Sequence, residues 1–226
     1  MKKIRVNGEL SLLLALAIIA LSIALVIKAD FGMTVVQAPV YVLSLALPFV
    51  SIGVWNYIVQ GLIMVLMIAI VKRVKVSYLL SFAAAVIYGL MLDFVNWLLA
   101  GVTAQFLWQR ILFFGAGYIL LCIAVAIFFT CKAPLMPYDI FVREVAAYKK
   151  ITIPKLKWIF DIACITTAVV ISLAITHKIK GVGIGTVIFA FTVSPVSSLI
   201  MKFLNARFEF KPFFRDKEYV LKTKRK

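Results

Sequence analysis

The chain has 226 residues, of which 64% are hydrophobic, and it carries a formal net charge of +16. Soluble domains are only about half apolar, so this composition excludes an ordinary soluble fold and favours a membrane protein. The basic residues gather in short clusters between apolar runs, so the charge indicates membrane topology, and no nucleic-acid partner is expected.

Six apolar runs are long enough to cross a hydrocarbon core of roughly 30 Å. In chain order they cover residues 10–27, 54–71, 76–99, 111–130, 158–176 and 182–203. Each should be helical, because lipid offers the backbone no hydrogen-bond partner. The sequence therefore predicts an all-α membrane protein with six transmembrane helices.

Two further segments are apolar or amphipathic but too short to span the membrane. Residues 34–50 carry two prolines and should dip into the membrane or pack on the bundle as a short helix. Residues 138–150 are amphipathic and predict an interfacial helix. Non-helical backbone is expected just before each, at 32–34 and 134–137. These paired elements either frame a central site or fill gaps between the long helices.

The two halves of the chain follow the same order of helix breakers, polar positions and apolar runs. Gln37 aligns with Asp139, and Gln60 aligns with Asp161. Each half holds three spans, an odd number, so the second half should insert upside down relative to the first. This pattern predicts two inverted three-helix repeats, each with a short broken or interfacial helix after its first span.

The predicted domain organisation is a first membrane repeat over residues 1–104 and a second, inverted repeat over 105–204. A basic aromatic cytoplasmic tail, residues 205–226, completes the chain. Under the six-span topology, four of the 25 basic residues lie on the less basic side: Lys28, Arg110, Lys178 and Lys180. The positive-inside rule then places both termini in the cytoplasm.

Polar side chains in or beside the spans are candidates for a solute site, since such groups are costly in lipid. They are Gln37, Asn56, Gln60, Asp93, Asp139 and Asp161. Glutamines in the first half and aspartates in the second would make one half of a site titratable, as in a proton-linked or cation-binding site. The alternatives are an interfacial salt bridge of Asp161 with Lys157 and a structural hydrogen-bonding role for Asp93.

A glycine-rich segment, 181–186, opens the last span. It lacks the Lys-Ser/Thr pair of a phosphate loop, so nucleotide binding is not expected. Gly183 and Gly185 either allow close helix packing or offer backbone amides to a ligand. The single histidine and three cysteines form no triad, HExxH or metal pattern. We therefore expect no catalytic residue, metal or cofactor, and no enzymatic activity.

Three elements carry a family resemblance: residues 27–32, the Ile-Gly-x-Trp-Asn element at 52–56, and the Gly-x-Gly-x-Gly-Thr-Val-Ile element at 181–188. Together they resemble the YczE/YitT-like group of bacterial integral membrane proteins. The resemblance implies a bacterial cytoplasmic-membrane protein and supplies no substrate. The group's acidic residue after the first glycine is replaced here by Gln37, whereas the second half keeps Asp139.

These observations support a small-solute transporter or permease that works through inverted repeats. Its expected partners are the lipid bilayer and an unknown small solute, with a homo-oligomer or a cytoplasmic protein as further possibilities. The alternative is a membrane accessory or regulatory protein that acts through a cytoplasmic partner.

Overall fold

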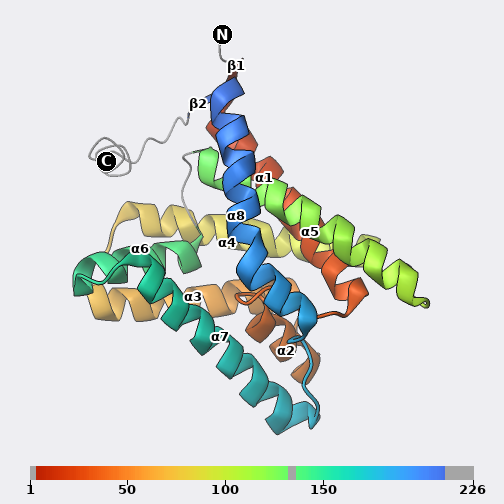
Figure 1. Cartoon of the computed structure of the whole chain (residues 1–226). Helices are drawn as coiled ribbons and strands as arrows, with labels where there is room; N and C mark the ends of the chain where they lie inside the picture. The colour runs from red at the N-terminus through yellow and green to blue at the C-terminus, as the bar shows by residue number, and fades with distance from the viewer. Residues whose placement is uncertain (1–3, 132–135, 212–226) are drawn as a thin grey trace.

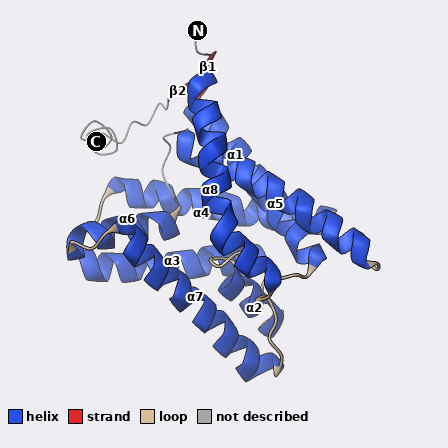
Figure 2. Cartoon of the chain, viewed as in Figure 1, coloured by secondary structure: helices blue, strands red, loops and turns tan. Residues whose placement is uncertain are grey.

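A computed structural model describes residues 4–131 and 136–211. Figure 2 shows that helices make up nearly all of this part of the chain. The six long helices are α1 (Gly8–Ala29), α3 (Ile52–Val71), α4 (Val76–Leu98), α5 (Leu107–Thr130), α7 (Ile153–Thr176) and α8 (Ile184–Arg207). The two short helices are α2 (Ala38–Ala46) and α6 (Pro137–Lys149), and the two strands are β1 (Ile4–Asn7) and β2 (Phe208–Lys211).

The six long helices are the ones long and apolar enough to cross a membrane among the described residues. The prediction of an all-helical chain with six helices long and apolar enough to span a membrane is therefore confirmed, and these helices suggest a polytopic membrane protein. Four spans start earlier than predicted, and the difference is largest for α5 and α7. The Gln109 side chain accepts hydrogen bonds from the amides of Gln105 and Phe106, which fixes the start of α5 at Leu107. Pro154, in the first turn, suits the start of α7.

Both described ends of the chain lie on one face of the molecule, which we call the terminal face. There α1 begins and α8 ends, and β1 pairs in parallel with β2 (Figure 1). The helix connections at the other ends of α1 and α8 form the distal face. Residues 205–211, assigned to the tail from sequence, belong to the last turn of α8 and to β2. Residues 212–226 lie outside the described part of the chain.

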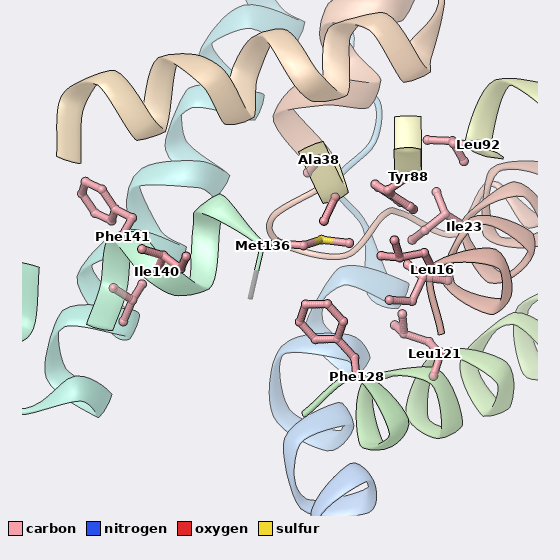
Figure 3. Packing of buried hydrophobic residues seen from close by; sticks show 14 of the residues in the cluster. Leu16, Ile23, Ala38, Tyr88, Leu92, Leu121, Phe128, Met136, Ile140 and Phe141 are labelled. Carbon is pink, nitrogen blue, oxygen red and sulfur yellow. The ribbon is translucent and has the colours of Figure 1, made fainter. Parts of the chain in front are cut away.

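The core is built around α1, which packs along α5 and also against α4. Leu16 and Ile23 of α1 meet Leu121 and Phe128 of α5 in this core (Figure 3). Gly117 lets the two backbones approach, because a Cβ there would lie 2.9 Å from Val26 of α1. Small residues at helix crossings are the usual means of close packing in membranes.

The neighbours of each helix follow a paired pattern. Helix α1 packs on α4, and α5 packs on α8; α2 packs on α3, and α6 packs on α7. The short helices also cross over, since α2 packs on α7 and α6 packs on α3. The clearest departure from the pattern is that α3 and α4 pack closely, whereas α7 and α8 have few contacts, of which Trp158 against Phe191 is one. A smaller departure is the contact of α4 with α6, which α8 and α2 do not match.

The two short helices each begin inside the protein and end at its surface. The first three residues of α2 are buried and Leu45 is exposed; Tyr138 of α6 is buried and the end of that helix, Tyr148 and Lys149, is exposed. Helix α6 also buries one side along its length, including Phe141 and Val145, as its amphipathic sequence suggested; its place at a membrane interface stays a prediction. Non-helical backbone precedes α2, as expected, with Gly32 at φ 110°. The corresponding expectation at 134–137 is met at Met136 and is wrong at Pro137, which begins α6, while residues 134–135 lie outside the described part of the chain.

Candidate functional site: a buried cluster of amides and phenols

Gln37, the residue before α2, lies at the centre of a buried polar cluster. Its Nε2 donates to Asn56 Oδ1 at 3.2 Å and to the Tyr88 hydroxyl at 2.9 Å. Gln60 is one helical turn from Asn56 on α3, so both amides lie on the same side of that helix. Asn56, Gln60 and Tyr88 are fully buried, and Gln37 is 7% exposed. We call these four residues the amide cluster.

The local sequence explains why these side chains meet. Ser51 caps α3 through a hydrogen bond to the amide of Val54, which sets where Asn56 falls on the helix. Pro39 in the first turn of α2 fixes the start of that helix just after Gln37. Tyr88 lies close to the midpoint of α4. Gln60 lies near the midpoint of α3, and Asn56 lies one turn closer to the start of that helix.

Tyr138, in the first turn of α6, adjoins the amide cluster. Burial raises the pKa of its phenol, and the nearby Tyr88 raises that pKa further. Figure 3 shows Met136, just before α6, beside Ala38, the first residue of α2, with Tyr88 close by. The two short helices thus begin near each other around Tyr88, and their N-terminal ends face the same region.

Several buried polar atoms in this region have no hydrogen-bond partner among the described residues. They are Gln37 Oε1, Asn56 Nδ2, both amide atoms of Gln60 and the Tyr138 hydroxyl. An unsatisfied buried donor or acceptor costs about 1–3 kcal/mol, and native proteins pair nearly all such groups. This group of unpaired atoms in one region indicates a binding site, either for water or for a polar solute.

Asp93, another predicted site residue, engages the start of α3 instead. Its Oδ1 accepts from the Gly53 amide at 2.7 Å, and its Oδ2 accepts from the Ser51 hydroxyl at 2.5 Å. A carboxylate at a helix N-terminus is favoured by the exposed amides and the helix dipole. Asp93 therefore joins α4 to α3 on the distal face.

Asp139 and Asp161 lie together between α6 and α7. Lys157 Nζ pairs with Asp161 Oδ1 at 3.1 Å, the interaction predicted from their i, i+4 spacing. Helix α6, which carries Asp139, is not among the six helices that are long and apolar enough to span a membrane. Burial raises the pKa of the Asp139 carboxyl to about 6, while Lys157 and Arg143 oppose the shift and Asp161 adds to it. The two aspartates thus belong to a charged group, and the amide cluster is neutral.

Gly183 and Gly185 pack against the chain that follows α1. The Gly185 amide donates to the Phe31 carbonyl at 2.8 Å, and the Met33 amide donates to the Gly181 carbonyl at 2.8 Å. A Cβ on Gly183 would lie 2.5 Å from the Phe31 carbonyl oxygen. Both predicted glycines therefore serve a close backbone approach, and the Gly185 amide is already used.

An open cavity of about 540 Å³ lies beside this approach on the distal face. Asp30, Tyr41 and Lys180 are among its lining residues, and no member of the amide cluster is. Arg110 fixes one wall, donating to the carbonyls of Ala29 and Asp30 at 2.8 and 2.9 Å. The cavity is a vestibule at the surface, separate from the buried cluster.

Sequence reasoning brought out three of the four cluster residues and missed Tyr88, together with the adjoining Tyr138. A tyrosine in the middle of an apolar span is itself a signal, because its buried hydroxyl needs a partner. Among the described residues, no three His, Cys, Asp or Glu side chains are grouped to hold a metal. Chemically, the cluster can donate and accept hydrogen bonds.

Comparison with known proteins gives one match. Residues 6–202 match the model of a family described as a family of unknown function, DUF6198. No curated protein and no solved structure matches the chain.

Proposed function

The chain belongs to DUF6198, a family of unknown function, and we propose that it is a small-solute transporter or permease whose site is the amide cluster. The observation that carries the proposal is the set of unpaired atoms on Gln37, Asn56 and Gln60 in the middle of six membrane-spanning helices. A stable membrane protein has no structural need for such groups in its core. A passing solute would satisfy them.

The proposal includes an inverted relationship between the two halves of the chain. The paired packing pattern supports it: exchanging α1 with α5, α2 with α6, α3 with α7 and α4 with α8 reproduces most helix neighbours. Two short helices that begin near the centre and end on opposite faces fit the same arrangement. Broken helices of this kind frame the central sites of many inverted-repeat transporters.

The exception to the paired pattern supports alternating access. The α3–α4 hairpin is tied by Asp93 at its distal end, while the matching α7–α8 hairpin has few contacts. Two halves of similar build in different conformations are what alternating access requires. In the proposed cycle, the α7–α8 hairpin closes as the α3–α4 hairpin opens.

We place the protein in the bacterial cytoplasmic membrane with the terminal face toward the cytoplasm. In this placement the connection between α3 and α4, which carries Lys72, Arg73 and Lys75, is cytoplasmic. The distal face carries Arg110, Lys178 and Lys180. Cytoplasmic loops are the ones enriched in Lys and Arg.

A thermal-shift screen of the purified protein against metabolites tests the proposal. A solute at one hundred times its dissociation constant stabilises a protein by about 2.7 kcal/mol. We expect a hit with wild type that is lost in Gln60→Leu and kept in Gln105→Leu, the same change at an exposed glutamine. If no solute shifts the folded protein, or if Gln60→Leu responds like wild type, the proposal fails. The accessory role would then be tested by capture of partners.

A further inference from the structure

We infer that the solute is a small, neutral, hydrogen-bonding molecule, such as a polyol or a carboxamide, and not an ion. The inference rests on the proposed function, because it names the substrate class of the same site. It is carried by the kind of atoms left unpaired in the amide cluster and by the two short helices that begin beside it.

The unpaired atoms form a mixed set. Gln37 and Gln60 each leave a carbonyl oxygen without a partner, while Asn56 and Gln60 each leave an NH₂ group. Rotating a side-chain amide exchanges its oxygen and nitrogen but keeps one acceptor and two donors in place. A ligand that satisfies this set must itself both accept and donate. Hydroxyl and carboxamide groups do both.

A monatomic ion does not match this set. A cation would find carbonyl oxygens but would face the NH₂ groups and the N-terminal ends of α2 and α6, which carry partial positive charge. An anion would be attracted by those N-terminal ends and NH₂ groups but repelled by the carbonyl oxygens of Gln37 and Gln60, and the amide cluster has no positively charged side chain to balance its charge. On α6 and α7, Lys157 is paired with Asp161 and Arg143 with Glu144.

The enclosure of the site limits the size of the solute. Asn56 and Gln60 have no exposed surface, and Gln37 is held by two hydrogen bonds. The distal vestibule does not reach these residues. A molecule of a few heavy atoms would take over the present Gln37 bonds with a small separation of the helices, whereas a large solute would require them to separate widely.

Solute flux into proteoliposomes tests this inference. Glycerol and acetamide serve as neutral probes, chloride and potassium as charged probes, and sucrose as an impermeant osmolyte that reports water alone. We expect glycerol or acetamide to enter faster than into protein-free liposomes. Replacing Gln60 with Leu should lower that rate about tenfold, the effect of losing one well-placed hydrogen bond. Gln105→Leu should match wild type.

The other outcomes distinguish the inferred substrate class from the proposed transport function. Flux of chloride or potassium that depends on Gln60 would overturn the neutral class and leave the transport function standing. Water permeation alone, if Gln60→Leu changes it, would identify water as the molecule that occupies the amide cluster. That result would also overturn the inferred substrate class. If the folded protein passes none of the probes, both the substrate class and the transport function fail. Removing an unpaired buried amide should not impair folding, so Gln60→Leu remains informative.

Discussion

Asp93 accepts a hydrogen bond from the backbone amide of Gly53 at 2.7 Å, and this contact ties the end of α4 to the first turn of α3. The Ser51 hydroxyl donates to the same carboxylate, so one acidic side chain satisfies two donors at the start of a helix. Gly53 and Gly89 lie face to face at this crossing, and a Cβ on Gly89 would lie 2.6 Å from the Gly53 carbonyl oxygen. The Asp93–Gly53 hydrogen bond and the close approach of Gly53 to Gly89 together hold α3 against α4.

The first prediction concerns Asp93 as the cap at the start of α3. Asp93→Ala should lower the stability of the protein by about 1–2 kcal/mol, because the amides at the start of α3 lose their acceptor. Asp93→Asn keeps one acceptor oxygen and should lose less. Thermal unfolding in detergent gives the measurement. Asn96→Ala is the control, because Asn96 donates only to the Leu92 carbonyl of its own helix; an equal loss in both variants would contradict the cap.

The second prediction concerns the crossing. Gly53→Ala should destabilise the fold by about 1–3 kcal/mol, the usual cost of overpacking, because the new methyl group would collide with the Gly89 carbonyl oxygen. Gly115→Ala on α5 is the matched control, since a Cβ there would have no atom within 4 Å. The control should be unchanged or more stable by up to about 1 kcal/mol. Similar thermal midpoints for the two variants would rule out a tight crossing.

The long helices could be predicted because each is a local property of the chain. An apolar run of about twenty residues must be helical in lipid, whatever its neighbours. The Lys157–Asp161 pair was equally local, because residues four apart on a helix are adjacent. Helix ends were less predictable, since α5 starts where Gln109 reaches back to two amides.

The site could be predicted only in part, because its members come from elements distant in sequence. Polarity identified Gln37 and Asn56, but their contact across 19 positions depends on how α2 packs on α3. Polarity also identified Asp93 as a candidate. Its partner, the Gly53 amide, could not be predicted, because the contact depends on the close approach of α3 and α4 at Gly53 and Gly89. Tyr88 was missed, because a tyrosine within an apolar span was treated as an apolar residue. Only the structure shows that its hydroxyl accepts a hydrogen bond from Gln37.

The third prediction concerns the distal face. Arg110 donates to two carbonyls and to the Asp30 carboxylate at 3.0 Å, and its guanidinium lies over the Phe31 ring. Lysine cannot reproduce that fork. Arg110→Lys should therefore speed amide hydrogen exchange around Met33, whose N–H bonds to Gly181. The control is Arg73→Lys on the terminal face. Unchanged exchange at Met33 would show that Arg110 does not order this segment.

The fourth prediction concerns pH. The pKa of Asp139 is raised from 3.8 to about 6 by burial, with Asp161 adding to the shift and Lys157 and Arg143 opposing it. Tyr138 and Cys164 are the other titratable groups nearby. Between these two pKa values the folded state holds a proton that the unfolded state has lost, so stability falls as pH rises through the window and stays lower above it.

Asp139→Asn removes this titration. Its thermal midpoint should vary less than that of wild type between about pH 4 and about pH 6, and should be higher than that of wild type at neutral pH. Asp30→Asn changes an exposed carboxylate on the distal face and should keep the wild-type profile. A profile for Asp139→Asn that parallels wild type would assign the pH dependence to other groups.

The last prediction separates a binding site from a structural core. If Gln60 were there to hold the helices together, replacing it should destabilise the protein, as removing a hydrogen-bonded buried group does. Neither of its amide atoms has a partner among the described residues, so we expect the reverse. Gln60→Leu should raise the thermal midpoint in the absence of solute, because the cost of burying an unpaired amide disappears. Gln37→Leu breaks the bonds to Asn56 and Tyr88 and should lower it. Destabilisation by both variants would make the cluster a structural network and remove the main support for a solute site.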